Sequence, residues 1–118
     1  MKKSIYLFLI LGLISMSCTN KVSNPFLVEW NAPFQTPPFD KIKTEHYVPA
    51  FKEGIKLHND EIKKIADNKD APSFQNTIEA LDYSGKILTR VRRVFTGMNE
   101  AMTNDEMGKI SKEISTLR

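Results

Sequence analysis

Cysteine and histidine are scarce in this chain of 118 residues, which has one cysteine and two histidines. A lone cysteine excludes an intrachain disulfide framework. The longest apolar run covers residues 5–14, and a membrane-spanning helix needs roughly 20 residues, so a transmembrane anchor is the less favoured interpretation. Glycine-rich phosphate loops and nucleophilic Ser/His/Asp signatures are also absent. We therefore expect neither a disulfide-stabilised scaffold nor a phosphate-binding loop.

The chain has little excess charge once its first residues are set aside. Its formal net charge is +3, and Lys2 and Lys3 supply two of those three charges. Residues 18–118 therefore carry a net charge of only +1. The sequence pI near 9.0 is thus no argument for a polyanionic ligand, and we expect no nucleic-acid partner.

Residues 1–17 have the features of a secretory signal peptide. Two lysines precede the apolar run, and small polar residues follow it. Cys18 comes next, as in bacterial lipoproteins, whose cysteine becomes the lipidated N-terminus, although Ser15 occupies a position that is usually aliphatic. We expect lipidation of Cys18, a tether over residues 18–23, and export to the periplasm or outer membrane with a lipid anchor in the membrane. The alternative is an ordinary leader whose cleavage leaves or removes a free thiol.

Residues 24–38 combine four prolines with large apolar side chains. Proline prevents a regular helix, yet so many aromatic residues are unusual for a disordered linker. We expect an extended N-terminal arm whose aromatic side chains, Phe26, Trp30 and Phe34, pack on helices elsewhere.

Apolar residues then recur at helical spacing and predict a first helix over residues 44–67. They are Tyr47, Phe51, Ile55, His58, Ile62 and Ile65. Thr44 is the expected N-cap. Pro49 lies too deep for a first-turn proline if that cap is correct, so the helix either starts at Pro49 or is kinked there.

A second helix is predicted over residues 73–102, with Ser73 as its N-cap. Its apolar stripe is Phe74, Ile78, Leu81, Gly85, Leu88, Val91, Phe95, Met98 and Met102. Glycine in a helix interior costs roughly 1 kcal/mol against alanine, so Gly85 marks either a kink or a tight crossing. We expect the face of Val91, Phe95 and Met98 to remain open to self-association.

A third helix is predicted over residues 104–118, with Thr103 or Asn104 as its cap. Its apolar positions are Met107, Ile110, Ile114 and Leu117. No segment predicts a strand. The expected fold class is all-α: an extended N-terminal arm followed by long antiparallel helices.

Two groups of polar residues are candidates for chemistry. His58 and Glu61 lie at i and i+3, a spacing that some helical metal sites use, but with one such pair a core or rim histidine is the favoured interpretation. His46 is expected to cap the helix start or to contact the arm. The second helix also carries a basic cluster, for which a solvated face paired with acidic neighbours is favoured over contact with peptide carboxylates or anionic lipid headgroups. This cluster consists of Lys86, Arg90, Arg92 and Arg93.

Several stretches occur in the order and spacing of one peptidase family. They are Asn24-Pro25-Phe26-Leu27, residues 38–51 (PFDKIKTEHYVPAF), residues 71–81 (APSFQNTIEAL) and Thr103-Asn104-Asp105-Glu106. Through them the chain resembles the N-terminal portion of the thimet oligopeptidase and peptidyl-dipeptidase (dipeptidyl carboxypeptidase) family of zinc metallopeptidases. The resemblance implies a helical fold with its active site in a deep channel. N-terminal helices of the family help to form the wall that restricts entry to short peptides.

The resemblance also implies a zinc site that this chain lacks. The family binds zinc through His-Glu-x-x-His on one helix, where the glutamate activates water. His46 and His58 are the only histidines, and neither begins that motif. We therefore expect no catalytic residue and no metal ligand in this chain, with zinc present only in the full-length family.

Our first hypothesis is that residues 24–118 form the N-terminal, non-catalytic helical region of a secreted zinc-dependent peptidyl-dipeptidase or oligopeptidase. Its partner would be the remainder of the peptidase, and short peptides would be substrates of the whole enzyme. The helical pattern is still running at Arg118, which favours a truncated chain. The alternative is a stand-alone helical lipoprotein that acts as a binding module at the cell envelope. A third hypothesis is a degenerate gene product without activity.

Overall fold

The computed structural model describes residues 23–117, and these residues form helices and irregular segments without a strand. The all-α prediction is confirmed for this part of the chain. The elements are the 3₁₀ turns Pro33–Gln35 and Thr44–His46, α1 (Tyr47–Ala66), the π-helical segment Phe74–Glu79, α2 (Ala80–Asp82), α3 (Lys86–Ala101) and α4 (Asp105–Ser115). The predicted signal peptide and Cys18 lie outside the described residues.

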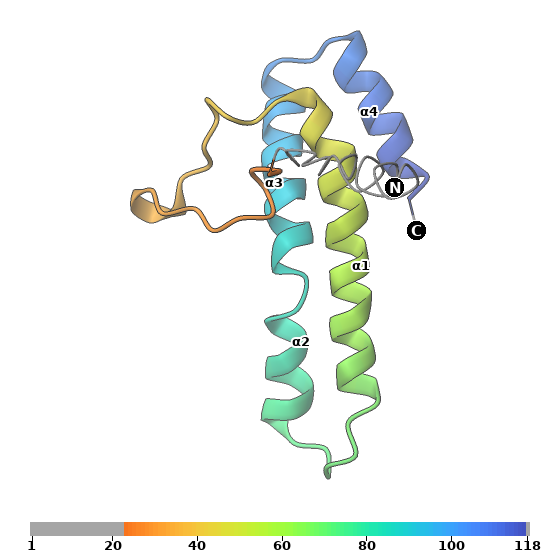
Figure 1. The fold of residues 1–118 in the computed structure, drawn as a ribbon. Helices are drawn as coiled ribbons and strands as arrows, with labels where there is room; N and C mark the ends of the chain where they lie inside the picture. The colour runs from red at the N-terminus through yellow and green to blue at the C-terminus, as the bar shows by residue number, and fades with distance from the viewer. Residues whose placement is uncertain (1–22, 118) are drawn as a thin grey trace, which may run out of the picture.

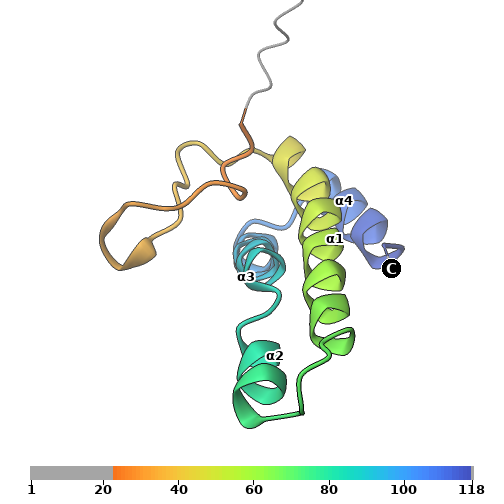
Figure 2. The ribbon, with the colours of Figure 1, turned by 60° about the horizontal axis from the view of Figure 1, so that its bottom comes forward.

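The helices form an antiparallel pair with a third helix beside it. α1 runs in one direction, and α2 and α3 return along it (Figure 1). α4 then lies on the α1 side of the pair, whereas the arm stands on the α3 side, as both views show (Figures 1 and 2). The predicted order of an extended arm and antiparallel helices is therefore what the structure contains.

The first helix begins at a different residue from the one predicted. A 3₁₀ turn precedes it, and the residue that flanks this turn is Lys43 rather than Thr44. α1 itself starts at Tyr47, so Pro49 is its third residue. The first four N–H groups of a helix have no intrahelical acceptor, and a proline there removes none of the helix's hydrogen bonds. The helix thus begins neither at Thr44 nor at Pro49.

The predicted second helix is interrupted at Gly85. Ser73 does cap its first turn, since the Ser73 hydroxyl accepts from Asn76 N–H at 3.1 Å. The chain then leaves the helix after Asp82, and Gly85 takes a left-handed conformation with φ of 68°. A Cβ at Gly85 would lie 2.8 Å from the His58 imidazole of α1. Gly85 therefore marks both a break and a tight crossing.

The core lies where α1, α3, α4 and the arm meet. Its buried apolar residues are Phe26, Tyr47, Ala50, Phe51, Val91, Val94, Phe95 and Met107. The Phe95 ring meets Tyr47 edge-to-face at 5.1 Å and Phe51 at 5.8 Å, an arrangement that aromatic quadrupoles favour. The expectation of an open face at Val91, Phe95 and Met98 was wrong, because Val91 and Phe95 are buried, Phe95 against two rings of α1, and Met98 is partly buried.

The end of the hairpin far from α4 has no comparable core. Three residues of the predicted stripe, Phe74, Ile78 and Leu81, are half or more exposed. Contacts place α4 along the first part of α1, so the far end has no third helix against it among residues 23–117 (Figure 1). A stripe buries its apolar surface only where a further element covers it.

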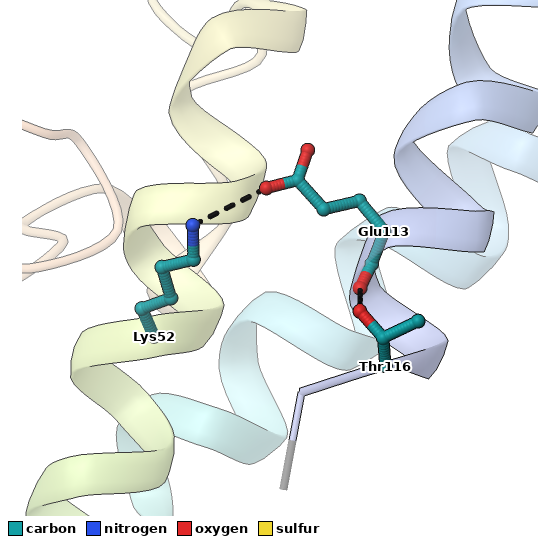
Figure 3. A network of polar contacts seen from close by, with 3 residues as sticks. All are labelled: Lys52, Glu113 and Thr116. Atoms are coloured by element: carbon teal, nitrogen blue, oxygen red, sulfur yellow. Dashed lines mark hydrogen bonds and ion pairs between the residues drawn. The ribbon is translucent and has the colours of Figure 1, made fainter.

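Polar contacts hold α4 against the start of α1. Lys52 Nζ lies 3.2 Å from Glu113 Oε1, and the Thr116 hydroxyl donates to the Glu113 carbonyl oxygen at 2.7 Å (Figure 3). The Thr44 hydroxyl donates to Glu106 Oε1 at 2.7 Å. Exposed ion pairs contribute roughly 0–1 kcal/mol, so the packing of α4 depends mainly on its apolar residues.

Candidate functional site

A tight turn at the start of the arm fixes its position on the helices. The Asn24 carbonyl oxygen accepts from Leu27 N–H at 2.9 Å, and Asn24 Oδ1 accepts from Phe26 N–H at 3.1 Å. Asparagine stabilises such turns with its side chain, and the proline that follows suits the next position. The turn directs Phe26 into the core, where the side chain is fully buried.

His46 joins this turn to the start of α1. Its Nδ1 accepts from Lys43 N–H at 3.0 Å, and its carbonyl oxygen accepts from Asn24 Nδ2 at 2.8 Å. The residue is buried. The prediction that His46 caps the helix start or contacts the arm is confirmed in both respects, and both of these contacts are structural.

Arg90 of α3 binds the arm from the other side. Its Nη1 donates to the carbonyl oxygens of Val28 at 2.9 Å and Phe26 at 3.2 Å. Its guanidinium carbon also lies 4.7 Å from the centre of the Trp30 ring, within the range of a cation–π interaction. Trp30 in turn donates from Nε1 to the Pro25 carbonyl oxygen at 2.8 Å. One basic residue thus holds both the turn and the arm's tryptophan.

The arm then bends at two residues in an unusual conformation. Phe34 and Gln35 have φ values of 59° and 54°, which place both in the left-handed region that glycine favours. The Phe34 side chain is fully exposed, with a relative accessibility of 102%. The packing prediction is therefore confirmed for Phe26 and Trp30 and wrong for Phe34.

A cleft separates this arm from α3, with a volume of about 490 Å³. Its arm wall is largely aromatic and apolar, and includes Trp30, Phe34 and Pro37. Its α3 wall is polar and basic, and is formed by Lys86, Thr89, Arg90, Arg93 and Val94. Among the described residues that line the cleft, Asp82 is the only acidic one.

The basic cluster is not paired with acidic residues in the described part of the chain. The ion pairs found there join Lys52 with Glu113, Lys56 with Glu53, and Lys63 with Asp67, and none includes a residue of the cluster. Lys86 Nζ instead lies 4.9 Å from the centre of the Tyr83 ring. The favoured interpretation is therefore confirmed in part: Lys86, Arg92 and Arg93 are exposed to solvent, but no acidic side chain among the described residues forms an ion pair with the cluster.

His58 and Glu61 meet the break before α3. Glu61 Oε2 accepts from Gly85 N–H at 2.6 Å, so a carboxylate of α1 occupies the place of a cap at the N-terminal end of α3, where negative charge is stabilising. His58 Nδ1 is buried without a hydrogen-bond partner and faces Gly85. The histidine is therefore half-buried at the helix crossing, and its Nδ1 makes no hydrogen bond there.

A metal centre is not formed by these residues. Between residues 23 and 117, no group of three or more His, Cys, Asp or Glu side chains could hold a metal ion. A catalytic zinc uses about three protein ligands together with a water molecule. The residues present therefore do not fit the zinc that the family resemblance implies, and we assign no catalytic step to them.

Within residues 23–117, no helix has the length and apolar character needed to cross a membrane.

Sequence reasoning missed the role of Asn24 in the turn, the contacts of Arg90 with the arm and the capping of α3 by Glu61. The role of Asn24 could have been predicted from the dipeptide Asn24-Pro25, because Asn-Pro commonly begins a turn. The capping of α3 by Glu61 had no sequence signal, because the two groups are 24 residues apart and meet only in the folded hairpin.

Comparison with known proteins agrees with the family resemblance over this part of the chain. No protein-family model matches the chain. Dipeptidyl carboxypeptidase of Escherichia coli (strain K12) is 48% identical over 92 residues, which are 78% of this chain and 14% of that protein. Dipeptidyl carboxypeptidase of Salmonella typhimurium is 44% identical over 93 residues, which are 79% of this chain and 14% of that protein. The chain therefore spans about 14% of the length of the curated relatives that it matches. This chain is homologous to a small part of dipeptidyl carboxypeptidase.

Proposed function

We propose that this chain is the non-catalytic helical part of a zinc-dependent peptidyl-dipeptidase or oligopeptidase that hydrolyses short peptides. The observation that carries the proposal is the 48% identity over 92 residues with a dipeptidyl carboxypeptidase. The helices would form part of the wall around the peptide-binding channel and would select short peptides by steric exclusion. The remainder of the peptidase is the partner in this proposal and supplies the catalytic groups.

The side chains of this chain that could bind a metal favour a structural role in the peptidase over a catalytic one. The sequence contains no His-Glu-x-x-His, and its two histidines are twelve positions apart, with His46 directly before α1 and His58 within it. His46 is already engaged with backbone groups, and Glu61 is engaged with Gly85 N–H. Zinc would be held by residues of the peptidase that this chain does not include.

Two measurements test the proposal. The nucleotide sequence after the codon for Arg118 should continue in an open reading frame that encodes His-Glu-x-x-His. The purified chain should release no C-terminal dipeptide from short peptides with or without added zinc, whereas the product of the longer frame should do so. An immediate stop codon would contradict the proposal, as would zinc-dependent hydrolysis by the purified chain that is lost in His58→Ala.

We also propose that the peptidase is exported and anchored in the membrane through lipidated Cys18. Support comes from the basic, apolar and small-residue segments of the first 17 residues and from the position of the cysteine after them. Stable anchoring takes two lipid signals, such as the several acyl chains of a lipoprotein.

Detergent phase partitioning tests this second proposal. The wild-type protein and Ser17→Ala, which keeps the cysteine, should enter the detergent phase, and Cys18→Ala should stay in the aqueous phase. Recovery of wild type and Cys18→Ala in the same phase would contradict lipid anchoring.

A further inference from the structure

The cleft between the arm and α3 has features that the proposed function does not use. Lys86, Arg90 and Arg93 are spaced by four and three residues and therefore share one face of α3, which is a wall of the cleft. Arg90 already binds the arm, through hydrogen bonds to two carbonyl oxygens and a cation–π contact with Trp30. Lys86 and Arg93 remain without an acidic partner among the described residues. The cleft therefore presents two available cations, one on either side of Arg90.

The separation of these two cations indicates how far apart two anionic groups of a ligand should be. Seven residues of α-helix rise by about 10 Å. A polyproline II segment has three residues per turn, so the side chains of residues i and i+3 point to the same side and are separated by roughly 9 Å. A segment with two acidic residues at i and i+3 would therefore match Lys86 and Arg93, whereas a single terminal carboxylate would reach only one of them.

The opposite wall offers apolar surface that nothing in residues 23–117 covers. Phe34 is fully exposed, and its backbone and that of Gln35 are held in the left-handed region. Such conformations are uncommon in non-glycine residues and cluster at functional sites. The chain thus maintains a strained bend that presents an aromatic side chain at the edge of the cleft.

We propose that this cleft binds an acidic peptide in the polyproline II conformation, with carboxylates at i and i+3 and an apolar side chain between them. The carboxylates pair with Lys86 and Arg93, and the apolar side chain packs on Phe34 and the exposed edge of Trp30. Asp82, at one end of the cleft, repels this ligand and lowers its affinity. The proposal is independent of the proposed peptidase role, because it concerns binding to this chain alone.

The single tryptophan of the chain makes the test direct, because Trp30 lines the cleft. The full chain is titrated with an acetylated and amidated peptide, Glu-Leu-Ala-Glu, and its emission is recorded. We expect a saturable change, with affinity at least about tenfold lower for Gln-Leu-Ala-Gln. Affinity for the acidic peptide should fall as salt rises from roughly 20 to 200 mM, because screening weakens exposed charge pairs.

Variants locate the site. Arg93→Gln and Lys86→Gln should each weaken binding by about fivefold or more, and Asp82→Asn should strengthen it. Phe34→Ala should weaken binding without any change of charge. Arg92→Gln is the matched control, because Arg92 is the exposed neighbour of Arg93 and does not line the cleft. Circular dichroism melting curves of each variant check that the fold is retained.

Three results would overturn the proposal. The first is equal affinity for the acidic peptide and its glutamine form. The second is a loss in Arg92→Gln as large as that in Arg93→Gln. The third is a stronger response to a neutral peptide with a free C-terminal carboxylate, or to vesicles with anionic headgroups, which would make a single terminal anion or a membrane surface the ligand.

Discussion

Arg90 and Trp30, which are 60 residues apart in the sequence, form one of the contacts that join the arm to the helices. The Arg90 guanidinium carbon lies 4.7 Å from the centre of the Trp30 ring. The same side chain donates to the Phe26 and Val28 carbonyl oxygens of the preceding turn. A guanidinium is planar, so it can stack flat on a ring while its N–H groups point outward in a fixed fork, whereas an ammonium group has neither the flat surface nor the fork.

Arg90→Lys should therefore detach this part of the arm although it keeps the charge. We expect the free energy of unfolding to fall by about 1–2 kcal/mol, since a stacked cation and two carbonyl hydrogen bonds are weakened. Urea unfolding followed by circular dichroism gives the loss, and a red shift of Trp30 emission reports the detachment. Arg92→Lys, at an exposed neighbouring position, should stay within about 0.5 kcal/mol of wild type. Equal losses in the two variants would contradict the role of Arg90.

Gly85→Ala should destabilise the helix crossing. The left-handed backbone at Gly85 disfavours any side chain, and the added Cβ would lie 2.8 Å from His58 Nδ1. We expect a loss of about 1–3 kcal/mol in the free energy of unfolding.

Gly97→Ala is the matched control for this effect. Gly97 lies inside α3, and a Cβ there meets no atom within 4 Å. Alanine is the better helix former, so this change should raise the free energy of unfolding by up to about 1 kcal/mol. Opposite signs are therefore expected for the two substitutions in the same urea experiment. A neutral or stabilising Gly85→Ala would mean that the left-handed conformation is not required.

Asn104 should cap α4 rather than Thr103. Asn104 Oδ1 accepts from Met107 N–H at 3.0 Å. Asn104→Ala should lower the free energy of unfolding by about 1 kcal/mol, and Asn104→Ser should recover most of the loss because serine also caps helices well. Chemical denaturation of the three proteins measures both effects. A loss that serine does not restore would indicate that the asparagine acts through another contact.

Burial of Tyr47 should make stability sensitive to alkaline pH. Burial raises the pKa of the Tyr47 phenol above its ordinary value of 10.0, because the phenolate would lose its hydration. Above pH 10 the unfolded chain releases this proton before the folded chain does, so the free energy of unfolding must fall as pH rises through this range. Below pH 10 the phenol is neutral in both states and contributes no pH dependence.

Tyr47→Phe isolates this contribution from other groups that titrate at high pH. Urea unfolding at a series of pH values should show a smaller decline above pH 10 in the variant than in wild type. Identical declines would mean that Tyr47 is not the responsible group.

Local sequence signals determined the helical segments and several of their ends. Ser73 was identified as a cap, and the cap of the last helix was narrowed to Thr103 or Asn104, because a cap hydrogen bond spans only three residues; the structure selects Asn104. Helical spacing likewise identified the apolar positions of the third predicted helix, of which Met107 is buried and Ile110, Ile114 and Leu117 are partly buried. The presence of the helices and the approximate positions of these caps can therefore be predicted from the sequence alone.

Only the tertiary structure decided how much of each stripe is buried and where the predicted second helix breaks. Phe74 and Val91 belong to one predicted stripe, yet the first is exposed and the second is fully buried. Periodicity shows which side of a helix is apolar, but burial also requires another element on that side, here α1, α4 and the arm. The cleft, the contacts of Arg90 and the capping of Gly85 by Glu61 depend on partners 24 to 64 residues away, and no local pattern encodes such distances.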